Sequence, residues 1–161
     1  MLLALILTAI YGVFLLRDRK ALNDRIIRLH VVGETNSQED QRIKELVRDA
    51  VLEKLEGLTS NTTSKQEVQE QLSGNLSILQ ATANEVLRSQ GVSSQARVTL
   101  KQEAFPTREY DTFTLPAGVY DSLRIVIGEG EGRNWWCVVF PSLCLPSTTE
   151  GFEIAAAGAG F

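Results

Sequence analysis

The stretch that decides the expected fold runs from residue 115 to residue 144 and reads LPAGVYDSLRIVIGEGEGRNWWCVVFPSLC. Pro116 presets the backbone of a tight turn and Gly118 suits its last position, so the chain is expected to reverse there. Within residues 119–127, Leu123, Ile125 and Ile127 fall on one side of a period-two pattern and Arg124 and Val126 on the other, which predicts a strand with an apolar face. Residues 135–140 are aromatic and β-branched. Pairing them with the preceding strand predicts a hairpin.

The glycine-rich segment between these strands, from Gly128 to Gly132, could be a phosphate-binding loop or a simple connection. Glycines let backbone amides approach a phosphate, but such a site needs a helix directly after the loop and disfavours neighbouring carboxylates. Glu129 and Glu131 lie within this segment, and a strand follows it. A hairpin connection is therefore the favoured interpretation, with Gly128 in a structural role.

Working outward, the upstream sequence predicts one strand, two helices and a further strand. Residues 26–32 are short in extent, rich in β-branched side chains and bounded by Gly33, which indicates a strand. Ser37 followed by acidic residues caps a first helix, and Ser64 with Glu67 forms a capping box for a second, which is expected to end at Gly91. Residues 95–105 alternate between apolar and polar, as expected for a half-buried strand with an antiparallel neighbour.

These elements predict an α+β fold. An N-terminal apolar helix would precede one strand and two amphipathic helices, and the helices would pack on one face of a mostly antiparallel sheet that ends in the hairpin. A length of 161 residues suits one compact domain. We expect that domain over residues 25–146, a signal or anchor segment over 1–20 and a flexible tail over 147–161.

The apolar run over residues 2–16 is the expected membrane contact. It is shorter than the roughly 20 residues that cross a hydrocarbon core unaided. A signal peptide carries positive charge before its apolar region, whereas here the positive residues come after it, at Arg17, Arg19 and Lys20. No convincing Ala-x-Ala site is present, so an uncleaved anchor is favoured over a cleaved signal. A buried core helix is the alternative.

Composition and motifs exclude several functions. The formal net charge is −4, and the basic residues are dispersed, so no nucleic-acid partner is expected. His30 is the single histidine and has no metal-binding neighbours in sequence, which favours a structural role. The sequence predicts no catalytic residues, no metal site, no cofactor and no small-molecule substrate.

Six residues separate Cys137 from Cys144, too many for a Cys-x-x-Cys redox motif. In an exported chain they are expected to form a disulfide that contributes about 2 to 3 kcal/mol. In a reducing compartment both would be buried thiols.

The two adjacent tryptophans must point to opposite faces of a strand, so one is expected in the core and the other outside. An outward tryptophan is a candidate anchor for a protein partner; packing alone is the alternative. The candidate partner surface comprises Arg124, Glu129, Asn134, Trp135 and Trp136.

Three stretches resemble the stage II sporulation protein R family of endospore-forming bacteria. They are LPAGVYDSLR continuing into IVIGEGEGRNWWCVVFPSLC, then IIRLHVVGETNSQEDQRIKELVRDAVL from residue 26, and FPTREYDTFTLPAGVY. The chain departs from the family pattern at Gly33 to Asn36, where the family usually shows Ala-Asn-Ser-Asp.

The resemblance implies a signalling protein and not an enzyme. Such a protein is made in the forespore, exported to or anchored in the space between the forespore and mother-cell membranes, and activates a membrane-bound aspartic protease that processes pro-sigma E. Two alternatives remain open: an extracytoplasmic hydrolase, which a cleft holding His30 and a perturbed carboxylate would favour, and a structural membrane-tethered domain, which would show no exposed aromatic patch.

Overall fold

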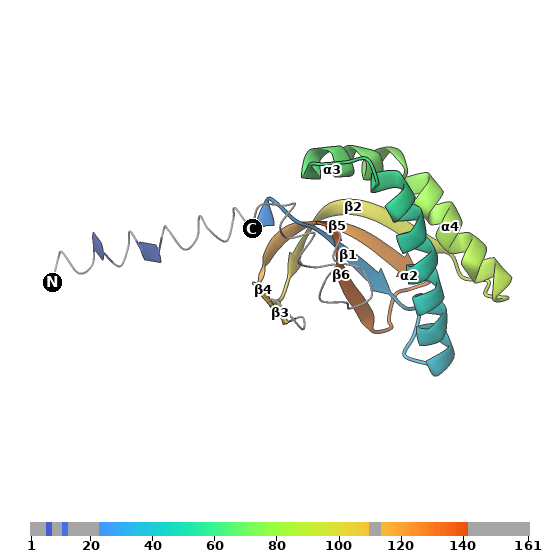
Figure 1. Ribbon diagram of the computed structural model, residues 1–161. Coiled ribbons are helices and arrows are strands. Elements are labelled where there is room, and N and C mark those ends of the chain that lie inside the picture. Colours follow the sequence, from blue (N-terminus) through green and yellow to red (C-terminus); the bar gives the residue numbers. More distant parts are fainter. Residues whose placement is uncertain (1–5, 8–10, 13–22, 110–113, 142–161) are drawn as a thin grey trace.

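The computed structural model describes residues 6–7, 11–12, 23–109 and 114–141. Within these ranges three helices cover one face of a four-stranded sheet, as Figure 1 shows. The elements of the body are β1 (Ile27–Val32), α2 (Gln38–Thr59), α3 (Lys65–Gly74), α4 (Leu76–Ser89), β2 (Ala96–Phe105), β3 (Arg108–Glu109), β4 (Thr114–Leu115), β5 (Gly118–Ile127) and β6 (Asn134–Phe140). The α+β class predicted from the sequence is confirmed.

The sheet has the order β2-β5-β1-β6. The β2–β5 and β1–β6 pairs are antiparallel, whereas β1 and β5 run parallel. The specific hairpin predicted between residues 119–127 and 135–140 is therefore wrong, because β1 lies between these two strands. The mostly antiparallel character holds, and β3 and β4 form a small antiparallel hairpin of their own.

The first helix begins where the sequence indicates. The Ser37 hydroxyl accepts a hydrogen bond from the Asp40 backbone N–H at 3.0 Å, which satisfies one of the free donors of the first turn of α2. The capping box of Ser64 and Glu67 is also present at the start of α3. The single second helix that the sequence predicted is instead two helices, because the chain leaves helical geometry at Asn75, directly after Gly74.

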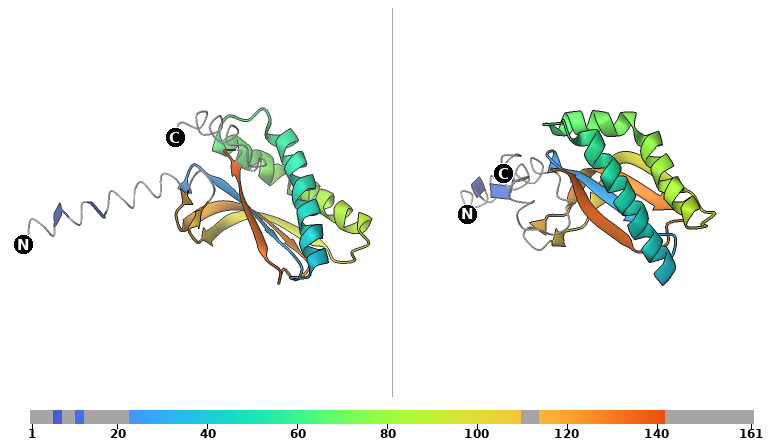
Figure 2. Two further views of the ribbon diagram at one scale, coloured as in Figure 1. Left: turned by 60° about the horizontal axis from the view of Figure 1, so that its bottom comes forward. Right: turned by 45° about the vertical axis from the view of Figure 1, so that its right-hand side comes forward.

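The two faces of the sheet have different environments (Figure 2). On the helix-covered face, alternate strand residues join the apolar stripes of α2, α3 and α4 in one core; its strand members include Leu29, Val31, Leu123, Ile125 and Val139. The opposite face, which we call the open face, carries a smaller cluster of Ile26, Phe105, Leu115, Tyr120 and Val138 with Trp136 packed against it. The period-two patterns thus place each strand's residues on the expected sides.

The predicted N-terminal helix and the tail lie almost entirely outside the described residues, as does the segment boundary near residue 146. Among the residues that are described, no helix has the length and hydropathy needed to span a bilayer. The division into an anchor, one domain and a tail stays a prediction.

Candidate functional site

The open face collects the polar and aromatic side chains that sequence reasoning spread over several strands. Strand register aligns Thr99, Arg124, His30 and Trp136 in one row across β2, β5, β1 and β6. Adjacent positions in such a row are close enough for their side chains to touch. The residues that line this part of the face are Arg28, His30, Glu103, Phe105, Tyr120, Ser122, Arg124 and Trp136, and we call them the open-face cluster.

Stacked rings form one half of this cluster. The His30 imidazole lies parallel to the Trp136 indole with 4.1 Å between ring centroids. Phe105 meets Trp136 edge to face at 5.1 Å, and the Arg108 guanidinium lies 4.9 Å from the centroid of the indole. Trp136 is half-buried as a result. It is the outward tryptophan of the pair, but other side chains hold it in place.

Trp135 lies on the helix-covered side. It packs against the main core, and the Arg48 guanidinium of α2 lies 4.9 Å from the centroid of its ring. The prediction that the two tryptophans lie on opposite faces is confirmed by these contacts. Since Trp135 is also half-buried, the difference in burial between the two rings is smaller than the sequence suggested.

Ion pairs centred on Glu103 form the other half of the cluster. Its Oε1 accepts a hydrogen bond from Arg124 Nη1 at 3.0 Å and lies 3.4 Å from Lys101 Nζ. Burial raises the pKa of this carboxyl, but the hydrogen bond and positive charge of Arg124, together with Ser122 and Lys101, lower it, and the pKa is lowered overall. Glu103 is therefore ionised near neutral pH and is matched by Arg124.

His30 lies next to this ion pair, with Nδ1 at 3.9 Å from Glu103 Oε2. Burial lowers the pKa of the imidazole, and the positive charge of Arg124 lowers it further, against the opposing effects of Asn134 and Glu103. The ring is thus neutral near pH 7. One face of its ring is covered by Trp136, so His30 occupies a packed position. The structural role expected for it stays a prediction.

Arg28 is the most deeply placed charged residue of the open-face cluster, with 0% of its surface exposed. Its guanidinium lies 4.1 Å from the centroid of Phe105 and 5.1 Å from that of Tyr120. A cation between two aromatic faces gains from both ring quadrupoles, and desolvation strengthens that attraction. Tyr120 is in turn fixed by its hydroxyl, which donates to the Pro116 carbonyl at 2.6 Å.

A second group of interactions joins the turn at Gly33 to Asn36 to the loop between β5 and β6. Gly132 N–H donates to the Gly33 carbonyl at 2.9 Å, Glu131 N–H to the Glu34 carbonyl at 3.0 Å, and Arg133 N–H to Asn36 Oδ1 at 2.9 Å. We call this contact the loop clasp. The loop crosses the end of β1 and is tied to the turn that follows it. The glycine-rich segment therefore connects β5 to β6 across β1, and it is not the hairpin connection that the sequence favoured.

Two glycines make the close approach of the clasp possible. A Cβ at Gly132 would lie 2.7 Å from the Gly33 carbonyl oxygen and would also collide with the Thr35 carbonyl. Gly128 adopts a φ of 56°, and a Cβ there would lie 2.6 Å from a carboxylate oxygen of Glu34. The same Glu34 carboxylate accepts a hydrogen bond from Ser94 Oγ at 2.6 Å. Both the backbone conformation of Gly128 and the nearby Glu34 side chain therefore disfavour any larger residue at this position.

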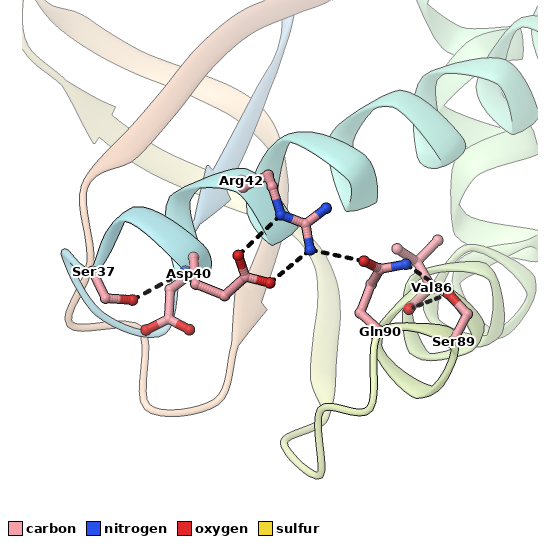
Figure 3. Close-up of polar contacts among 7 residues, drawn as sticks. Ser37, Asp40, Arg42, Val86, Ser89 and Gln90 are labelled. Carbon is pink, nitrogen blue, oxygen red and sulfur yellow. Dashed lines mark hydrogen bonds and ion pairs between the residues drawn. The ribbon is translucent and has the colours of Figure 1, made fainter.

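A polar hollow of about 630 Å³ opens beside the clasp at the start of α2. Arg42 lies in its wall and bridges Glu39 of its own helix and Gln90 at the end of α4, at 2.6 and 2.9 Å (Figure 3). Arg133 and Glu45 complete the charged part of the lining. Two arginines and two glutamates therefore leave the charged part of this lining balanced.

The other predicted site residues lie at the margin of this cluster or outside it. Glu129 is exposed in the β5–β6 loop, whereas Asn134, exposed at the start of β6, lies next to His30. Gly118 begins β5, and the Asn23 side chain occupies the place of its missing Cβ. Cys137 is disulfide-bonded, while Cys144 lies outside the described residues, so the pairing of these two positions stays a prediction. The described residues include no group of three side chains suited to a metal ion.

The structure thus brings together Arg124 and Trp136, with His30 between them, and leaves Glu129 apart. Sequence reasoning missed Arg28, Glu103, Phe105 and Tyr120. One signal could have found the first of these: in the β1 segment Arg28 and His30 alternate with apolar residues, which places both on a single face.

The fold described above defines a small α+β domain with one helix-covered face and one ionic and aromatic face. The sequence model described as stage II sporulation protein R matches residues 23–150 of this chain. The chain therefore belongs to the stage II sporulation protein R family, a family of sporulation proteins.

A comparison with curated proteins agrees. The chain is 34% identical over 128 residues to stage II sporulation protein R of Bacillus subtilis (strain 168). The matched region is 80% of this chain and 57% of that relative. The chain thus spans little more than half the length of the curated relative that it matches. Among solved structures, none matches the chain significantly.

Proposed function

We propose that this protein is a sporulation signalling protein that activates a membrane-bound aspartic protease, which then processes pro-sigma E in the mother cell. The observation that carries the proposal is the family match over residues 23–150, which includes every strand and helix of the body. In this proposal the protein is exported from the forespore and acts as the signal, while the protease supplies the chemistry.

The open-face cluster supports this proposal as the docking surface for the protease. It offers an indole ring flanked by arginines, the residue types that dominate the energy of protein interfaces. Trp136 is held by His30, Phe105 and Arg108, so little side-chain entropy remains to be lost when a partner covers it. Arg124 and Lys101 extend the surface with positive charge next to Glu103.

The hydrolase alternative gains less from the geometry. His30 does have a carboxylate neighbour in Glu103, and a neutral imidazole could accept a proton, but the positive charge of Arg124 lowers the pKa of both groups. Trp136 stacks on the imidazole ring at 4.1 Å. A general base must reach a proton on its substrate, but His30 is only 7% exposed and does not line the hollow beside the clasp.

Co-expression tests the proposal. The full chain, the protease and its pro-sigma substrate are produced together in a non-sporulating host, and processing is followed by the change in size of the substrate. We expect processing only when all three are present and the protease has its active-site aspartates. Processing that continues without this chain, or that fails with all three present, would contradict the proposed function.

A further inference from the structure

The edge strand β2 carries a feature that no part of the proposed signalling function uses. β2 lies at one end of the sheet order and, among the described strands, pairs with β5 alone (Figure 1). An edge strand offers free backbone donors and acceptors to another strand unless the protein protects it. In β2 only the first half is protected.

Protection of the first half comes from α4. The Ala96 N–H donates to Asn84 Oδ1 at 2.7 Å, and the Val98 N–H donates to Gln80 Oε1 at 3.1 Å. These two N–H groups therefore point away from β5. The Gln95 carbonyl, one position earlier, points toward β5 and accepts from the Gly128 N–H at 3.0 Å.

Because backbone groups alternate along a strand, the remaining even-numbered residues of β2 also point outward. These are Leu100, Gln102 and Ala104, and in the described part of the chain no acceptor meets their N–H groups. Lys101, Gln102 and Ala104 are exposed, while Leu100 and Glu103 are half-buried. At the far end, Pro106 follows the strand and has no N–H to donate. The free edge is thus five residues long, from Leu100 to Ala104.

The charge order of this free edge is complementary to itself. In an antiparallel pair of two identical edges centred on Gln102, Lys101 of each chain lies opposite Glu103 of the other. The same register places Leu100 opposite Ala104 on the helix-covered side. Opposite charges that face each other across strands are favourable, and like charges are unfavourable.

Neighbouring registers lack this match. A pair centred on Lys101 places two lysines opposite each other, and a pair centred on Glu103 does the same with two carboxylates. Within one chain, Lys101 Nζ and Glu103 Oε1 are 3.4 Å apart, so both side chains already project along the same side of the strand. Of these three registers, charge favours the one centred on Gln102.

We propose that β2 is a homodimerisation edge, where a second copy of this chain pairs antiparallel through Leu100 to Ala104 and joins the two sheets into one. The interface is isologous, as in a twofold dimer. It places the two open-face clusters on the same face of the combined sheet, so one dimer presents two copies of the surface that contains Trp136.

Disulfide trapping of the full chain in a mild detergent tests the register. Residues of a hydrogen-bonded antiparallel pair have Cα atoms about 5.5 Å apart, a separation that suits a disulfide. Gln102→Cys is therefore expected to give a covalent dimer under mild oxidation. Thr99→Cys is the matched control, because Thr99 is also exposed on β2 but would lie six positions, roughly 20 Å, from its equivalent. Equal trapping of both variants, or trapping of neither, would overturn the proposal.

Two further variants test the forces that hold the pair. Lys101→Glu replaces two attractive contacts with two repulsive ones and is expected to raise the dimer dissociation constant roughly tenfold or more. Gln102→Pro removes an outward N–H that β5 does not use, so the chain should fold as a monomer. Sedimentation velocity measures both, with circular dichroism confirming the fold. A dimer that Lys101→Glu leaves unchanged would mean that the copies meet elsewhere.

Discussion

The loop clasp gives the sharpest test of the fold, through the variant Gly132→Ala. The new methyl group would lie 2.7 Å from the Gly33 carbonyl oxygen and would also overlap the Thr35 carbonyl. Both neighbours are backbone atoms, which cannot rotate away, so the loop itself has to move. Movement breaks the hydrogen bonds that Gly132 and Glu131 donate to the turn after β1.

The expected cost follows from these contacts. Two backbone hydrogen bonds contribute about 0.5 to 1.5 kcal/mol each, and overpacking typically adds about 1 to 3 kcal/mol. Because the loop lies at the molecular surface and can relax in part, we expect Gly132→Ala to lower the free energy of unfolding by about 2 to 4 kcal/mol. Urea denaturation followed by tryptophan fluorescence measures this change.

Gly57→Ala is the matched control. Gly57 lies within α2, and a Cβ there would meet no atom within 4 Å. Alanine is the better helix former by about 0.5 to 1 kcal/mol, so the same chemical change should stabilise the protein. If Gly132→Ala unfolds within about 0.5 kcal/mol of the parent chain, the clasp does not have the tight backbone contact described here.

Three other predictions follow from the open face and the N-terminus. Trp136→Ala should abolish protease activation in the co-expression assay and lower the free energy of unfolding by about 2 to 3 kcal/mol, because the variant loses the ring contacts with its neighbours. Trp135→Ala should lose a similar amount of stability but retain activation. Equal loss of activation in both variants would contradict the open face as the docking surface. Because the pKa of His30 is lowered in the folded state, the unfolded chain binds a proton first as pH falls below about 6.5. The free energy of unfolding should therefore decrease from that pH downward. His30→Gln should lack this decrease between about pH 6.5 and 5, where Glu103 stays ionised because its pKa is lowered. Deleting residues 1–16 should leave a folded, monodisperse body, because every strand and helix of the body begins at or after Ile27; aggregation of that shorter chain would place the apolar segment in the core.

Local features of the fold could be predicted because their causes are local. Ser37 and Ser64 cap helices in the structure as their sequence context indicates, and alternation placed Arg124 on the correct side of β5. The strand order could not be predicted in this way. The segment from residue 128 to residue 134 is short enough to close a hairpin. The hairpin does not form because β1, which comes from a distant part of the sequence, pairs between β5 and β6.

The same limit applies to the candidate site. Alternation assigns Glu103 to a face, but its pairing with Arg124 depends on the register of β2 against β5, which no local pattern encodes. The division of the second helix is different, since Gly74 and Asn75 are both poor helix formers. These two residues could have predicted the break, but the apolar stripe continues on both sides of them and favoured one long helix.

The position of β1 between β5 and β6 determines when the open face can form during synthesis of the chain. β1 is the first strand of the body to be synthesised, yet both of its neighbours come from the far end of the sequence: Leu29 pairs with Leu123 on one side and Cys137 on the other. Contacts between such distant segments slow folding, because a long stretch of chain must be ordered before they form. His30 cannot stack on Trp136 until β6 has been made. A chain interrupted before residue 134 would lack the indole and leave one edge of β1 unpaired, so incomplete products could not present the open face. Synthesis past residue 140 is in this sense a precondition for presenting the proposed docking surface.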